Sequence, residues 1–184
     1  MTAFGWGAAL LAFITAQRIV ELWWAKQNER RLFAAGGIEF GRSHLFLIVV
    51  LHAAWIIGLW MLGYDRSVNP FFLVVVVLLQ VARFWVLFTL GRRWTIRIVA
   101  VPGEILVARG PYRFLRHPNY AVVAGEFAAV PLALGLPIYA LVFTILNAAV
   151  LAIRLPEENA ALTATLRGEG LSRDGDFRGS RLVG

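Results

Sequence analysis

Long apolar runs alternate with short polar stretches along the chain. A helix needs about 20 apolar residues to cross a bilayer, with roughly 17 as the lower limit. The pattern therefore predicts an all-α integral membrane protein with about five transmembrane helices, folded as a single domain over residues 1–184. The last two runs are short and predict a tight helical hairpin that need not cross the bilayer fully. The five runs are residues 3–24, 45–62, 70–90, 120–136 and 138–153.

Composition agrees with a membrane protein. Hydrophobic residues make up 59% of the chain and charged residues 16%, against roughly 25% charged residues in soluble domains. The chain has no cysteine, which excludes disulfides, thiolate metal sites and cysteine nucleophiles, and we expect no metal site. The formal net charge is +7, but the basic residues flank the apolar runs. That placement is typical of a membrane topology signal and argues against a nucleic-acid partner.

Basic residues are distributed unevenly between the predicted loops. The stretches 25–43 and 91–119 are rich in arginine, whereas the connection 63–69 holds a single one. Loops rich in Lys and Arg stay on the cytosolic side. The N-terminus is therefore expected outside, with the loop 91–119 and the tail 167–184 in the cytosol. We expect a multi-pass protein of the bacterial inner membrane whose site faces the cytosol.

The long loop and the tail differ in pattern. Residues 95–108 alternate β-branched and polar residues around Pro102-Gly103, which predicts two short extended segments and a turn. The tail 167–184 is rich in Gly, Arg and Asp and has few apolar anchors, so we expect it to be mobile.

A polar block, Gly110–Tyr120, reads GPYRFLRHPNY and lies between two apolar runs. Titratable groups are costly near hydrocarbon, so such a block marks a candidate functional site. Pro118 suits the first turn of a helix. His117 is then placed at the helix entrance, where the positive end of the helix dipole favours a neutral imidazole.

A second polar block, Arg154-Leu-Pro-Glu-Glu158, follows the last apolar run. Arg154 and Glu158 are four residues apart and share a helix face, whereas Glu157 points about 100° away. If the hairpin closes, these side chains come near His117 and Tyr120. The resulting pocket would carry both signs of charge and would suit a zwitterionic or cationic small molecule.

Further polar residues lie inside the apolar runs. Arg18 and Glu21 are expected to pair on the first helix, and His52 is expected to make an interhelical hydrogen bond rather than bind a ligand. Glu126 lies roughly 9 Å into the helix that Pro118 begins, where a carboxylate needs a partner. That partner is a ligand group or one of two residues of the third run, Arg83 or Gln80.

The two blocks together carry a resemblance. The segment GPYRFLRHPNY, followed by Arg154-x-x-Glu157-Glu158, resembles the isoprenylcysteine carboxyl methyltransferase (ICMT) family. The match is to its short bacterial branch, in which Arg93-Trp94-Thr95 and Pro102-Gly103 also recur.

The resemblance implies an S-adenosylmethionine-dependent methyltransferase that modifies an oxygen of a lipidic acceptor. It implies Arg154 and Glu158 as catalytic residues beside the acceptor. Arg154 and, from its buried position in the helix, Glu126 are the candidates for acceptor binding. Membrane lipids are the expected surroundings, and no obligate protein partner is evident. The cofactor would be bound at the cytosolic side by Tyr112, His117, Pro118, Tyr120, Glu157 and Glu158.

The sequence is compatible with several classes of methyl acceptor. The tail does not match the C-terminal segment of animal and fungal members, which favours alkylpyrones or alkylresorcinols, associated with the bacterial branch, over a prenylcysteine carboxylate. A phospholipid N-methyltransferase is an alternative. An NADPH-dependent membrane reductase with a similar RHPNY segment is another, although the C-terminal continuation usual in such reductases is missing.

Overall fold

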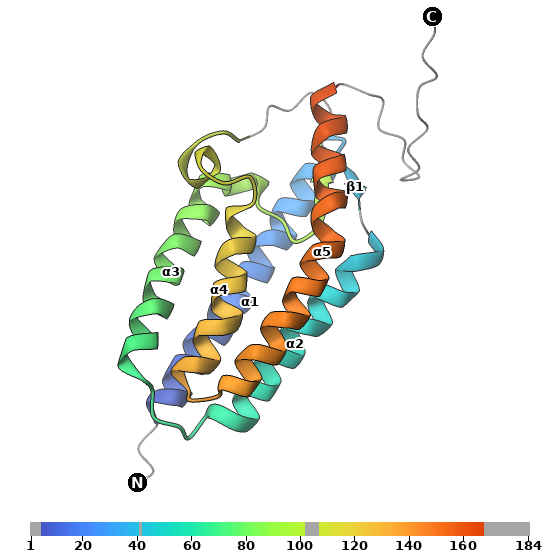
Figure 1. Ribbon diagram of the computed structural model, residues 1–184. Helices are drawn as coiled ribbons and strands as arrows, with labels where there is room; N and C mark the ends of the chain where they lie inside the picture. Colours follow the sequence, from blue (N-terminus) through green and yellow to red (C-terminus); the bar gives the residue numbers. More distant parts are fainter. Residues whose placement is uncertain (1–4, 41, 102–106, 168–184) are drawn as a thin grey trace, which may run out of the picture.

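The computed structural model describes residues 5–40, 42–101 and 107–167, so the predicted mobile tail after Arg167 and the second extended segment of the loop lie outside the described residues. The described chain is mainly helical (Figure 1). Its long helices lie side by side in one elongated bundle: α1 (Trp6–Ala34), α2 (Arg42–Gly63), α3 (Pro70–Leu90), α4 (Pro118–Ala133) and α5 (Pro137–Arg167).

Four of these helices are long and apolar enough to cross a membrane: α1, α2, α3 with the turn that follows it, and α5. The helix α4 has 16 residues and is about 24 Å long. It packs between α3 and α5, and it contributes wholly buried side chains such as Phe127 and Val130 to the core. The protein is thus an all-α integral membrane protein in which the shortest helix is an inner one.

The predicted tight hairpin joins α4 and α5. The turn needs only Leu134, Gly135 and Leu136, and the amide of Leu136 donates to the carbonyl of Pro131 at 2.9 Å. Gly135 adopts φ 67°, a left-handed conformation that glycine enters without steric cost. The turn therefore fixes α4 antiparallel to α5 and brings their far ends together.

Two helices extend beyond the ranges predicted from the sequence. The helix α1 continues ten residues past the predicted end at residue 24, and α5 runs from Pro137 through Pro156 to Arg167 instead of ending at residue 153. Hydropathy marks where a helix leaves the apolar layer, but a helix can continue into water. The second polar block is consequently a part of α5, and its side chains are held on a rigid helix.

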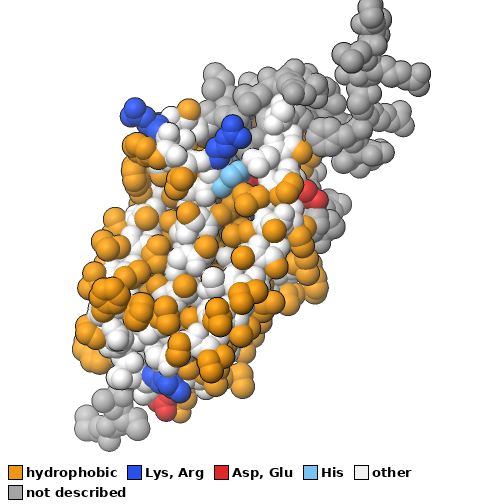
Figure 2. Space-filling view, in the orientation of Figure 1, with side chains coloured by type: hydrophobic (Ala, Val, Ile, Leu, Met, Phe, Trp, Pro, Cys, Tyr) orange, Lys and Arg blue, Asp and Glu red, His pale blue; other side chains and the backbone are white. Residues whose placement is uncertain are grey.

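Hydrophobic side chains cover most of the length of the bundle, and Lys and Arg gather near its ends (Figure 2). The core includes Trp55 of α2, which stacks on Phe127 at 4.7 Å between ring centroids. Many large apolar residues lie instead on the outer surface, among them Val74, Leu78 and Val81 of α3. An apolar exterior of this kind is expected where lipid tails are the solvent.

A two-stranded antiparallel sheet lies where the polar loops meet. It pairs β1 (Ile38–Phe40) with β2 (Ile98–Ala100), and Glu39 lies opposite Val99. The extended character of β2 was predicted, but its partner β1 was not. The sheet anchors the loop before α4, and short 3₁₀ turns, η1 (Gly91–Arg93) and η2 (Gly110–Arg113), complete that loop.

Candidate active site

A cavity of about 890 Å³ extends from the loops into the bundle. Its loop end is lined by side chains from η2, α4 and α5, and its inner part mostly by apolar side chains such as Ile48, Val49, Val123 and Leu151. Four residues that the two sequence blocks were predicted to bring together line the loop end, His117, Tyr120, Arg154 and Glu158, and Tyr112 joins them.

Glu158 lies at the centre of this polar end. The Tyr120 hydroxyl donates to its Oε2, and Nδ1 of His117 lies 3.5 Å from its Oε1. Nε of Arg154 lies 3.9 Å from Oε2, as expected for residues one turn apart on one helix face. One carboxylate is thus surrounded by a phenol, an imidazole and a guanidinium.

Arg154 is held in place from two sides. Its Nε donates to the Tyr120 hydroxyl at 2.5 Å, and its Nη2 donates to the carbonyl of Ile96, which directly precedes Arg97 and β2. The residue is only 7% exposed, so it does not simply extend toward water. Its Nη1 makes no hydrogen bond to the residues that the structure describes. A fixed cation with one free donor can orient an anionic or polar ligand.

His117 is bonded on both ring nitrogens. Nδ1 faces Glu158, and Nε2 lies 2.9 Å from Oδ1 of Asn159. The hydrogen bond with Glu158 raises the pKa of His117 above its usual 6.5, and the bond with Asn159 also raises it. The sequence expected the helix dipole to favour the neutral imidazole, whereas these contacts from α5 shift the pKa in the direction of the protonated form.

The raised pKa of His117 predicts a pH-dependent stability. The folded protein binds this proton more tightly than the unfolded chain, so the contribution is fully present below about pH 6.5. It is lost as the pH rises through the folded-state pKa. Melting temperatures of the ligand-free protein in detergent should therefore differ most between wild type and His117→Gln at acidic pH, and the difference should shrink above neutral pH. A constant difference across the range would contradict this role.

The remaining predicted cofactor residues lie close to the same end. Pro118 is buried and begins α4, as predicted. Burial raises the pKa of Tyr112, and the nearby Glu158 adds to the effect, so the Tyr112 hydroxyl keeps its proton. Glu157 is half-buried but is not among the described residues that line the cavity. It lies on a neighbouring face of α5, as its spacing from Glu158 predicted.

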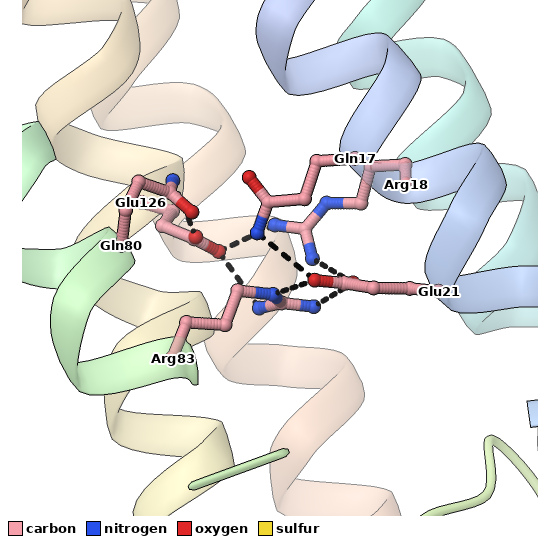
Figure 3. A network of polar contacts seen from close by, with 6 residues as sticks. All are labelled: Gln17, Arg18, Glu21, Gln80, Arg83 and Glu126. Carbon is pink, nitrogen blue, oxygen red and sulfur yellow. Dashed lines mark hydrogen bonds and ion pairs between the residues drawn. The ribbon is translucent and has the colours of Figure 1, made fainter. Parts of the chain in front are cut away.

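Glu126 lies apart from this polar end, in a buried ion-pair cluster (Figure 3). The cluster comprises Gln17, Arg18 and Glu21 of α1, Gln80 and Arg83 of α3, and Glu126 of α4. Glu126 accepts hydrogen bonds from Gln80 at 2.9 Å and from Arg83 at 3.0 Å, and it pairs with Arg18. It has the structural partners that the sequence suggested, and it is wholly buried.

The same cluster confirms the expected pair on the first helix. Nη1 of Arg18 lies 3.0 Å from Oε2 of Glu21. Arg83 bonds both carboxylate oxygens of Glu21, from Nε to Oε1 and from Nη2 to Oε2, each at 2.5 Å. Two arginines and two glutamates therefore neutralise one another, which is the arrangement that allows charges inside an apolar bundle. Arg18, Glu21 and Arg83 also line the cavity.

Two site features were not predicted from the sequence. The first is Asn159, which directly follows the second block. Its position one residue after Glu158 was the only sequence signal that could have marked it as a site residue. The carbonyl of Ile96 reaches Arg154 only because the loop folds back on α5, and a backbone contact of this kind leaves no signal in the side-chain pattern.

The fold and the cavity together define a polytopic membrane protein whose titratable pocket opens into an apolar chamber. The profile of the isoprenylcysteine carboxyl methyltransferase (ICMT) family matches residues 72–164, half of the chain, including both polar blocks. The chain belongs to this family, and its membership assigns it to the membrane methyltransferases.

Two bacterial proteins are similar over most of their length. The Bacillus subtilis protein called "Uncharacterized protein YpbQ" is 36% identical over 158 residues, which cover 83% of this chain and 94% of that protein. An "Uncharacterized protein" of Haemophilus influenzae is 25% identical over 166 residues, 83% of this chain and 92% of that protein. No solved structure gives a significant match.

Proposed function

We propose that the protein transfers a methyl group from S-adenosylmethionine to an oxygen atom of a lipidic acceptor. The observation that carries the proposal is the position of Arg154. It is a fixed cation whose Nη1 bonds none of the described residues, and it lies beside Tyr120 and Glu158, at the junction of the polar and apolar parts of one cavity. A water-soluble donor and a lipidic acceptor can meet at such a junction.

The polar end has the chemistry that S-adenosylmethionine requires. The cofactor carries an amino-acid group, ribose hydroxyls and a sulfonium cation, and it supplies an electrophilic methyl carbon. Tyr112, Tyr120 and the Glu158 carboxylate are suited to the cation. Oδ1 of Asn119 is buried without a partner among the described residues and lines the cavity, so it can accept a bond from an ammonium or hydroxyl group. His117 and Pro118 lie at the same helix entrance.

Arg154 is proposed to orient the acceptor. A carboxylate or an acidic enol or phenol is ionised, or nearly so, at neutral pH and needs little help from a base. A guanidinium can bind such an oxygen and hold it beside the methyl carbon, and positioning alone supplies a large part of the acceleration in such reactions. Tyr120 and the Ile96 carbonyl prevent Arg154 from swinging away. Glu158 in turn fixes Tyr120.

The apolar chamber is proposed to hold the tail of the acceptor. Its lining of Ile48, Val49, Ile56 and Val150 suits an alkyl chain better than a charged headgroup. We propose an alkylpyrone or an alkylresorcinol as the acceptor, with a prenylcysteine carboxylate as the main competitor. In the proposed orientation the polar end faces the cytosol of a bacterial inner membrane, because the arginine-rich loops lie at that end.

One experiment tests both the donor and the orientation. S-adenosylmethionine with a labelled methyl group is added to inverted and to right-side-out inner-membrane vesicles that contain the protein and an alkylresorcinol. Because the charged donor does not cross lipid, labelled lipid should form only in inverted vesicles. Labelled lipid in right-side-out vesicles alone would show that the polar end faces the opposite side of the membrane. The vesicles are also permeabilised with detergent and supplied with alkylpyrone or prenylcysteine acceptors. If no labelled lipid forms under any of these conditions, the proposed function is contradicted. Vesicles carrying Glu158→Ala provide the control.

A further inference from the structure

The inner part of the cavity holds polar groups that the proposed reaction does not use. Among its mainly apolar lining residues are Asn147 of α5 and His52 of α2. A polar group in such surroundings is costly unless it is hydrogen-bonded, so each of these side chains needs a partner.

Asn147 lacks that partner. It is only 2% exposed, and its Nδ2 makes no hydrogen bond to any described residue. It shares the cavity-facing side of α5 with Leu151, Arg154 and Glu158, at intervals of four, seven and eleven residues that repeat one helix face. Nδ2 of Asn147 is thus a donor buried beside the cavity, deeper in the bundle than Arg154.

His52 offers the complementary group. Its Nδ1 lies 2.9 Å from the carbonyl of Ile48. A carbonyl only accepts, so Nδ1 must carry the hydrogen. In the neutral ring Nε2 is then an acceptor, and no described residue bonds to it. The predicted interhelical hydrogen bond of His52 is not formed with the described residues, because the ring bonds within its own helix.

Phe127 links the surroundings of His52 on α2 with α5. The ring of Phe127 lies 5.0 Å from His52 and 6.5 Å from Phe143, measured between centroids. Asn147 is one turn beyond Phe143 on α5, which is about 6 Å along the helix. A donor on one helix and an acceptor on another therefore line one cavity.

We propose that Asn147 and His52 form a second polar subsite, which binds a hydroxyl group of the acceptor. A hydroxyl accepts from Nδ2 of Asn147 and donates to Nε2 of His52, so it satisfies both groups at once. This inference rests on the proposed function, since it concerns the same acceptor. It adds that the acceptor carries two oxygen groups, one near Arg154 and one deeper.

The two binding groups are separate positions on one helix. Arg154 and Asn147 are seven residues apart, which is about 10 Å along α5. One oxygen atom therefore cannot serve both, and the acceptor needs two oxygen groups. An alkylresorcinol carries two hydroxyls on one aromatic ring and meets this requirement.

The test compares two probes that differ in one hydroxyl. An alkylresorcinol and the 3-alkylphenol of equal chain length are titrated into the detergent-solubilised protein, and tryptophan fluorescence reports binding. Wild type should bind the dihydroxy probe about tenfold more tightly, as one buried hydrogen-bonded group warrants. In Asn147→Leu this preference should fall to about onefold to twofold.

Thr144→Val is the matched control. Oγ1 of Thr144 is also buried without a described partner, but Thr144 is not among the described residues that line the cavity. The preference for the dihydroxy probe should persist in this variant. If wild type binds both probes equally well, the proposal is overturned, because water then satisfies the subsite as well as the second hydroxyl does. A preference for the dihydroxy probe that survives in Asn147→Leu also overturns it. Because binding is measured without methyl transfer, a retained preference with no transfer contradicts only the proposed function.

Discussion

Replacing Arg154 by alanine should lower methyl transfer by about 100-fold or more, which corresponds to about 3 kcal/mol of transition-state stabilisation. Nη1 of Arg154 bonds none of the described residues, and the substitution removes the group proposed to orient the acceptor. Affinity for S-adenosylmethionine should change by less than about threefold, because the cofactor contacts proposed for Tyr112, Asn119 and Glu158 remain.

Arg154→Lys should recover only a part of the activity. Lysine supplies the charge but not the planar group that bonds Tyr120 and the Ile96 carbonyl together. Initial rates of methyl transfer and calorimetric titration of the cofactor separate the two effects. Arg113→Ala is the matched control, since Arg113 is exposed on η2 and should be dispensable. Full activity in Arg154→Ala would show that the residue only supports the loop.

Replacing Glu126 by leucine should destabilise the protein by about 3–5 kcal/mol, because it leaves two buried arginines with one carboxylate. Glu126 is 0% exposed and bonds Arg18, Arg83 and Gln80. Unfolding in mixed micelles by a chemical denaturant gives the free energy. Glu29→Ala is the comparison variant. Arg97, the ion-pair partner of Glu29, is far more exposed than the arginines of the buried cluster, so this substitution should cost about 1 kcal/mol of stability at most.

A double variant tests the charge argument directly. Combining Glu126→Leu with Arg18→Leu leaves Arg83 paired with Glu21 and restores neutrality. This variant should be more stable than Glu126→Leu alone, although it has lost more hydrogen bonds. If Glu126→Leu unfolds like wild type but no longer binds the acceptor, Glu126 has the ligand-binding role that its buried position also allowed and little structural role.

The sequence predicted the polar site well because its parts are local. The spacing of Arg154 and Glu158 fixes their common face on any helix, and Pro118 marks the start of α4. The family resemblance and the membrane class also followed from these blocks and from the apolar runs. The upward shift of the His117 pKa was missed, because it depends on Glu158 and Asn159 from a helix forty residues away.

Helix ends and tertiary partners were harder to predict. Hydropathy falls at residue 153, yet α5 continues, since a helix can carry polar residues past the apolar layer and can tolerate Pro156. The pairing of Arg18 with Glu21 was predicted from their spacing. Their junction with Arg83 and Glu126 depends on the packing of α1, α3 and α4, which spacing along one helix does not encode.

The buried ion-pair cluster also bears on how the chain enters the membrane. Arg18 and Glu21 arrive together on α1 and balance each other, whereas Arg83 on α3 arrives with no carboxylate on its own helix. An arginine near the bilayer centre costs about 2.5–3.5 kcal/mol on the scale of the insertion machinery. The cluster becomes neutral only after α4, the shortest α-helix, has been inserted and has brought Glu126 next to Arg83. During synthesis, α4 is therefore the segment that completes the charge balance of the helices already made.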